Sequence, residues 1–106
     1  MRISMVGAAA AAVGAVALIT APLAAAGPEE DFLKVIADGG IEWPSGSTQA
    51  IIDGGHGVCE DWDNGASFAD EVASITDATG WSDYDAGFFI GAATGAFCPE
   101  YEAKVS

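Results

Sequence analysis

Apolar side chains recur at intervals of three and four residues in four stretches of the chain beyond residue 27. The second stretch shows this best, with Ile51, Gly55, Val58, Cys59 and Trp62 on one helical face. Such spacing is the period of an α-helix that buries one side. The first stretch runs from Pro28 to Gly39 and Gly40, and the second from Ser45 or Ser47 to Asn64 and Gly65. The third runs from Ser67 to Thr79 and Gly80, and the fourth from Ser82 to Cys98 and Pro99. We therefore predict an all-α domain of four helices.

Two of the predicted helix starts carry a capping signal. Ser67 is followed three residues later by Asp70, which is a variant of the capping box, and Ser82 opens the fourth helix in the same way. The short tail over residues 100–106 has no such signal, and we expect it to fray.

The fourth predicted helix is apolar on every side between Ala86 and Cys98, which is typical of a helix buried among others. Gly87, Gly91 and Gly95 give it one smooth face. That face could serve as a glycine zipper for self-association or membrane insertion, but the apolar run is too short to span a bilayer. We expect close packing inside the domain, against the second helix.

The first 26 residues have the features of a cleavable signal peptide. Arg2 precedes an apolar stretch, and Ala24 and Ala26 form the small-x-small pattern that signal peptidase recognises before Gly27. An uncleaved membrane anchor is the alternative. We expect cleavage.

Export through the general secretory pathway then leaves residues 27–106 as one mature domain, secreted or held in the cell envelope. The membrane is contacted only by the signal peptide during export. All 16 acidic residues of the chain lie in this domain, against Lys34 and Lys104, which leaves a net charge of −14. So few cations cannot displace the counterions of phosphates, and this excludes the usual electrostatic kind of nucleic-acid binding.

Cys59 and Cys98 are the only cysteines of the chain. An exported protein meets an oxidising compartment, which favours their pairing. A redox pair, an intermolecular bridge and a metal site are the alternatives, but the chain has no Cys-x-x-Cys motif and only one histidine, His56. We expect a structural disulfide that joins the second helix to the end of the fourth.

The mature part resembles the domain of unknown function 732 family, small secreted helical proteins of mycobacteria and related actinobacteria. The resemblance rests on Phe32 and Leu33 after an acidic start, Gly40-Ile41, Gly57-Val58-Cys59, Gly65-Ala66-Ser67-Phe68, Asp85-Ala86-Gly87-Phe88-Phe89 and Ala96-Phe97-Cys98-Pro99. It implies a small disulfide-linked helical domain behind a signal peptide. It implies no established activity.

Several acidic residues and one histidine are candidates for a metal site or a catalytic site. Glu60, Asp61, Asp63, Asp70 and Glu71 could suggest calcium, since that ion prefers carboxylates, but Trp62 falls where a loop ligand is needed. We interpret these acids as a solvated surface. His56 has no partner histidine and no nucleophile motif around it. We expect no catalytic residue, no metal site and no cofactor.

The aromatic residues are the most informative candidates for binding. Trp43, Trp62, Trp81 and Tyr84 lie in predicted loops or near helix ends, where they could form an exposed surface. The alternative is that they cover a small core. The leading hypothesis is a secreted, non-enzymatic binding or interaction module for an unknown protein, and the alternative is a carrier of a small hydrophobic ligand, a lipid or haem.

Overall fold

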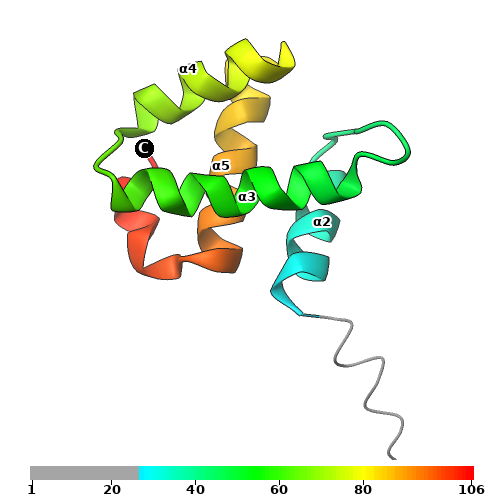
Figure 1. Ribbon diagram of the computed structural model, residues 1–106, viewed down its shortest axis with the longest axis horizontal. Coiled ribbons are helices and arrows are strands. Elements are labelled where there is room, and N and C mark those ends of the chain that lie inside the picture. Colours follow the sequence, from blue (N-terminus) through cyan, green and yellow to red (C-terminus); the bar gives the residue numbers. More distant parts are fainter. Residues whose placement is uncertain (1–26) are drawn as a thin grey trace, which may run out of the picture.

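The computed structural model describes residues 27–106, which form a helical domain without strands in that range (Figure 1). The elements in chain order are α2 (Pro28–Asp38), α3 (Thr48–Asp63), α4 (Phe68–Thr79), α5 (Asp83–Phe97) and the 3-10 helix η2 (Pro99–Lys104). The predicted all-α domain of four helices is confirmed. The predicted signal peptide and its cleavage residues Ala24 and Ala26 lie outside the described residues. Within residues 27–106 no helix has the length and apolar character needed to cross a membrane.

The helix boundaries follow from local capping interactions. The Asp70 backbone N–H donates to Ser67 Oγ at 3.1 Å, and the Ser67 N–H donates to Asp70 Oδ2 at 3.2 Å, which completes the capping box of α4. Ser82 Oγ accepts from the Asp85 N–H at the start of α5. Gly80 ends α4 in the left-handed conformation, with φ of 77°, which costs glycine little because it has no Cβ. The capping signals of α4 and α5 are therefore confirmed.

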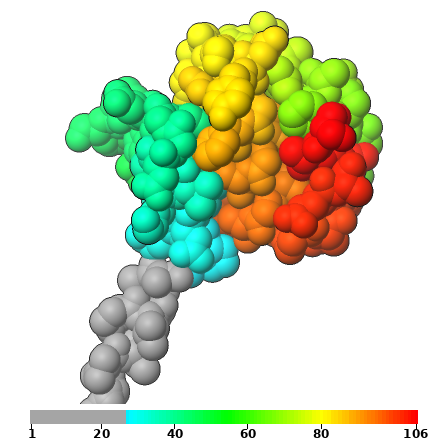
Figure 2. Space-filling model, turned by 180° about the vertical axis from the view of Figure 1, so that it is seen from behind, coloured from blue at the N-terminus to red at the C-terminus, as the bar shows by residue number. Residues whose placement is uncertain are grey.

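Helix α5 is the centre of the domain and packs against α2, α3, α4 and η2. Figure 2 shows it between α2 and η2, with the end of α4 above it. The fully buried residues of the core lie mostly on α2 and α5 and include Phe32, Ile36, Ala86, Ile90 and Ala93. Phe32 joins the two helices, since its ring lies 5.3 Å from that of Phe89 and 5.1 Å from that of Phe97. A helix without a polar face is thus buried, as its sequence predicts.

The glycine face of α5 does not pack as expected. A Cβ on Gly87 would lie 3.4 Å from Phe68, one on Gly91 would lie 3.7 Å from Val105, and one on Gly95 would lie 3.6 Å from Glu102. These are ordinary contacts with side chains of α4 and of the C-terminal segment. The prediction that this face packs closely against α3 was wrong, because α3 lies against another side of α5.

Close approach occurs instead at Gly55 of α3. A Cβ there would lie 2.9 Å from both the Phe32 and the Phe97 ring, whereas a Cβ on Gly57 would meet nothing within 4 Å. Glycine costs about 1 kcal/mol relative to alanine inside a helix. At Gly55 this cost is offset because α3 can lie directly on the two rings.

The C-terminal segment is ordered, contrary to the expectation that it frays. Residues Pro99–Lys104 form η2, and Tyr101 and Val105 pack against the core. The Tyr101 hydroxyl donates a hydrogen bond to Asp63 at the end of α3. This contact raises the pKa of the tyrosine above its ordinary value. The tail therefore closes one end of the domain.

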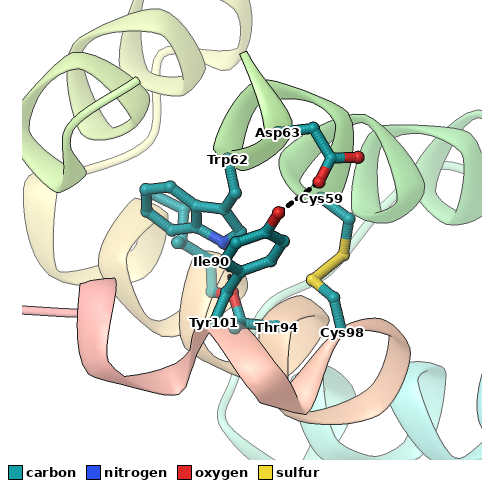
Figure 3. The surroundings of a disulfide bond; sticks show 7 residues. All are labelled: Cys59, Trp62, Asp63, Ile90, Thr94, Cys98 and Tyr101. Carbon is teal, nitrogen blue, oxygen red and sulfur yellow. Dashed lines mark hydrogen bonds between the residues drawn. A yellow bond between two sulfur atoms is a disulfide. The ribbon is translucent and has the colours of Figure 1, made fainter. Parts of the chain in front are cut away.

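The predicted disulfide is confirmed. Cys59 on α3 and Cys98 at the end of α5 are bonded, with their Cα atoms 6.1 Å apart (Figure 3). The bridge, the Tyr101–Asp63 bond and the side chain of Trp62 occupy the same corner of the domain. The bridge thus ties α3 to the junction of α5 and η2. All packing described above lies within residues 27–106.

Candidate functional site

A groove of about 240 Å³ opens between α3 and α4. The two helices diverge from their connection at residues 64–67 and are each held by α5 (Figure 1). Most of the groove lining is apolar: Ala50, Ile51 and Val58 of α3, Ile75 and Ala78 of α4, and Trp81 and Phe89. Of these residues Val58 and Phe89 are buried in the core, and the other five remain partly or fully exposed along the groove.

Two carboxyl groups lie in the groove near the connection of the two helices. Asp61 belongs to the last turns of α3 and Glu71 to the first turn of α4, so the pair marks the end where the helices meet. Glu71 is only 3 % exposed, although it is an acid. The other end of the groove is bordered by Thr79 and Trp81. The groove thus has an acidic end, at Asp61 and Glu71, and an end that is mostly apolar.

Burial changes the protonation of Glu71. Loss of solvent raises its pKa from 4.5 to about 8, helped by the hydrogen bond to Asp61 and by the negative charges of Asp61 and Asp70. The N-terminus of α4 favours a carboxylate, but such a dipole contributes only about 0.3–1 kcal/mol. Each pKa unit corresponds to about 1.4 kcal/mol, so desolvation outweighs the dipole. Near pH 7 the Glu71 carboxyl is therefore mostly protonated.

The structure does not bring the four predicted surface aromatics together. Trp62 is buried at 2 % exposure, so its assignment to a partner surface was wrong. Trp62 lies four residues after Val58, on the face of α3 that packs against α5, and its indole N–H donates a hydrogen bond inside the core. Trp81 is half-buried in the groove, with its ring 5.5 Å from that of Phe89. Only Trp81 of the four contributes to this site.

The other two aromatics lie elsewhere. Trp43 lines a separate shallow hollow with Ile41, and its Nε1 donates to Thr48 Oγ1 at 3.1 Å. Tyr84 is 75 % exposed at the start of α5. Neither residue is part of the groove lining.

His56 belongs to α3, and its side chain lies apart from the groove, beside the start of α2. Its Nε2 is 3.0 Å from Glu29 Oε2, and its ring stacks on Phe97 with the centroids 4.0 Å apart. It lines a broad hollow of about 640 Å³ that also includes Gly27. Across residues 27–106 no three His, Cys, Asp or Glu side chains gather in a way that could hold a metal ion.

Sequence reasoning placed Glu71 on a solvated acidic surface, and this was wrong. The signal that could have identified it is its spacing: Phe68, Glu71, Val72 and Ile75 recur at three and four residues, so Glu71 shares the apolar face of α4. An acid on such a face is buried when the helix packs. Asp61 joins it only because α3 and α4 meet at their connection.

Comparison with known proteins gives one family. The family model described as "Protein of unknown function (DUF732)" matches residues 28–100, which include all four α-helices of the domain and both cysteines. Neither the curated proteins nor the solved structures contain a match to this chain.

Proposed function

The chain belongs to the family of proteins of unknown function DUF732, and we propose its function from the geometry of the domain. We propose that it is a secreted, non-enzymatic binding module that engages a partner polypeptide through the α3–α4 groove. The observation that carries the proposal is the groove itself, with apolar walls and a buried acid at one end. A few convergent polar groups within an apolar concavity are typical of binding sites.

The frame around the groove suits recognition. Helix α5 supports both walls, and the Cys59–Cys98 bridge ties α3 to the end of α5. A preorganised site loses less entropy when a partner binds. Trp81 supplies aromatic contact area, and aromatic side chains are enriched among residues that dominate binding energy. The partner is expected to place the apolar part of one side chain between Trp81 and Ile75.

A carrier of lipid or haem is less consistent with these dimensions. Pockets for drug-sized ligands are typically about 300–1,000 Å³, and the groove is about 240 Å³. The hollow beside His56, the only histidine of the chain, has a volume within this range at about 640 Å³, but Glu29 and Glu30 line it together with the apolar residues, which disfavours an acidic lipid or the propionates of haem. A single side chain from a polypeptide fits the smaller volume better.

Peptide selection tests the proposal. Peptides are selected from a displayed random library on the oxidised domain of residues 27–106, then measured on two variants. Ala78→Gln extends a long uncharged side chain into the groove, and Ala73→Gln places the same side chain on the exposed surface of the same helix. We expect selected peptides to bind wild type and Ala73→Gln alike and to lose at least tenfold in affinity on Ala78→Gln. Equal binding to both variants, or no enriched peptide, would contradict the proposal.

Export is the second part of the proposal, and it depends on residues 1–26. Their composition supports a signal peptide that is removed before Gly27. Intact-mass measurement of the protein recovered from the culture medium and the cell envelope tests this. A mass that begins at Gly27 is the expected result, and full-length protein confined to the cytoplasm would contradict it.

A further inference from the structure

Building on the proposed function, we infer that the groove receives a lysine or arginine side chain of the partner polypeptide, with its aliphatic stem against Ile75 and Ala78 and its cationic head at Glu71 and Asp61. The inference concerns the chemistry of the ligand, which the proposed function leaves open. It rests on the order of side chains along the groove, on burial and on charge.

The order of side chains fits a long cation. Ile75 follows Glu71 by four residues and Ala78 follows Ile75 by three, so accessible apolar side chains lead away from the carboxyl on the same face of α4. The two carboxyls lie where the helices meet, and the apolar residues continue toward Trp81. A lysine or arginine side chain has the same sequence of properties, because its methylene stem buries against apolar surface while its head seeks polar partners.

The protein itself supplies no cation to the carboxyl pair. The charged groups that face Glu71 are Asp61 from α3 and Asp70 from its own helix, both acidic. Phe89 of α5 and Trp81 border the groove without charge. The basic side chains of residues 27–106 are engaged elsewhere: Lys34 with Asp38, Lys104 over the Trp62 ring, and His56 with Glu29.

A buried carboxyl group that faces other acids and has no cation beside it favours its protonated form. Near pH 7 that proton lies on Glu71, whose pKa is raised to about 8 by burial and by its acidic neighbours. An arriving ammonium or guanidinium group favours the ionised form of Glu71, so the proton leaves to the solvent. Binding should therefore strengthen as the pH rises toward 8, by up to about tenfold per pH unit.

The net charge of the domain points to the same class of partner. Residues 27–106 contain 16 acidic residues against two lysines, which attracts a basic polypeptide and repels anionic lipids or fatty acids. Arginine and lysine differ in shape, since the guanidinium can bond both carboxyls at once. Either head group satisfies the pair.

The test uses four nine-residue peptides with identical glycine and serine flanks. The central residue is lysine, arginine, acetyl-lysine or norleucine; lysine, acetyl-lysine and norleucine share one stem and differ in charge and polarity, and arginine is the second cation. Nuclear magnetic resonance follows the Trp81 indole N–H and the Ile75 and Ala78 amides. We expect the lysine and arginine peptides to bind at these reporters about tenfold or more tightly than the norleucine and acetyl-lysine peptides. This difference corresponds to a charge-assisted hydrogen bond.

Two outcomes would overturn the inference. Equal binding of the norleucine peptide would show that the cation contributes nothing, while groove binding, and with it the proposed function, would stand. Lack of binding by all four peptides would also overturn the basic-side-chain inference. The library selection with Ala78→Gln would then decide the proposed function separately.

Variants of the carboxyl pair give a second readout. Glu71→Gln preserves the size and neutrality of the protonated acid, and we expect it to remove the rise of affinity between pH 6 and 8. Combining it with Asp61→Asn should make the lysine and norleucine peptides bind alike. Glu60→Gln, an exposed acid on α3, is the matched control and should leave both properties unchanged. A pH dependence that persists in Glu71→Gln would contradict the assignment.

Discussion

The Trp62 indole N–H on α3 donates to Thr94 Oγ1 on α5 at 3.0 Å, and both side chains are buried. The threonine hydroxyl in turn donates to the Ile90 carbonyl at 2.7 Å. The only polar residue in the apolar stretch of α5 therefore satisfies the only polar group of a buried tryptophan. This bond sets the position of α3 on α5, next to the disulfide.

Thr94→Val should destabilise the domain by about 1–3 kcal/mol, because it leaves a buried indole N–H without an acceptor while nearly preserving side-chain shape. Thr48→Val is the matched control. Thr48 also accepts from a tryptophan, Trp43, but that pair is partly accessible to water, so its loss should cost less than about 0.5 kcal/mol. Urea unfolding measures both. Equal effects would show that burial of the Trp62–Thr94 pair is energetically unimportant.

Gly55→Ala should lower stability, since the added Cβ would lie 2.9 Å from the rings of Phe32 and Phe97. Overpacking of this kind costs about 1–3 kcal/mol, which exceeds the gain of about 1 kcal/mol in helix propensity. Gly57→Ala on the same helix meets nothing within 4 Å and should raise stability by up to about 1 kcal/mol. Thermal unfolding compares the two. A melting temperature raised by both variants would contradict the close approach at Gly55.

The stability of the domain should fall as the pH rises from about 4.5 to about 8, because folded Glu71 keeps a proton that the unfolded chain releases. The stabilisation that protonated Glu71 provides is complete below the pKa of the unfolded chain, 4.5, and is lost as the pH rises through the folded pKa of about 8. The slope is at most about 1.4 kcal/mol per pH unit. Denaturant unfolding at pH 5, 6, 7 and 8 measures it.

The Glu71→Gln variant separates this effect from the other charges. It should match wild type near pH 5 and exceed it at pH 8, because glutamine stays neutral throughout. Glu60→Gln removes an exposed acid and should keep the slope of wild type. Parallel profiles for wild type and Glu71→Gln would show that Glu71 ionises normally.

Removing the Cys59–Cys98 bridge should cost about 4 kcal/mol, because the bridge spans 39 residues and restricts the unfolded chain. This is comparable to the whole stability expected of a small domain. Urea unfolding of the oxidised protein is compared with the reduced protein and with the double variant Cys59→Ser, Cys98→Ser. A midpoint shared by all three samples would contradict the prediction.

Local sequence signals were sufficient to predict the helices and the residues at which α4 and α5 begin. Ser67 with Asp70, and Ser82 with Asp85, form their caps from residues three apart, so no distant contact is needed to place the starts of α4 and α5. Ser47 is the N-cap of α3, as one of two predicted starts, although its side chain makes no capping bond. The disulfide was also predictable, since only one pairing exists for two cysteines.

The candidate site was less predictable, because it depends on which helix faces meet. Glu71 has the spacing of an apolar-face residue, but its burial depends on α3 and α4 meeting at Asp61. Trp62 has the spacing of a core residue and lies near a helix end, so the sequence permitted both a buried and an exposed position. Thr94 on the neighbouring helix decided between them.

By itself, the sequence determined four helices, the caps of α4 and α5, the single bridge and the acidic character of residues 27–106, since these follow from spacing, local bonds and composition. Only the tertiary structure decided which glycine lies against a ring, Gly55 rather than Gly91, and which acid is buried, Glu71 rather than Glu60. The spacing of residues along a helix determines which side chains share a face. Close approach and desolvation depend instead on which side chains another helix places opposite that face.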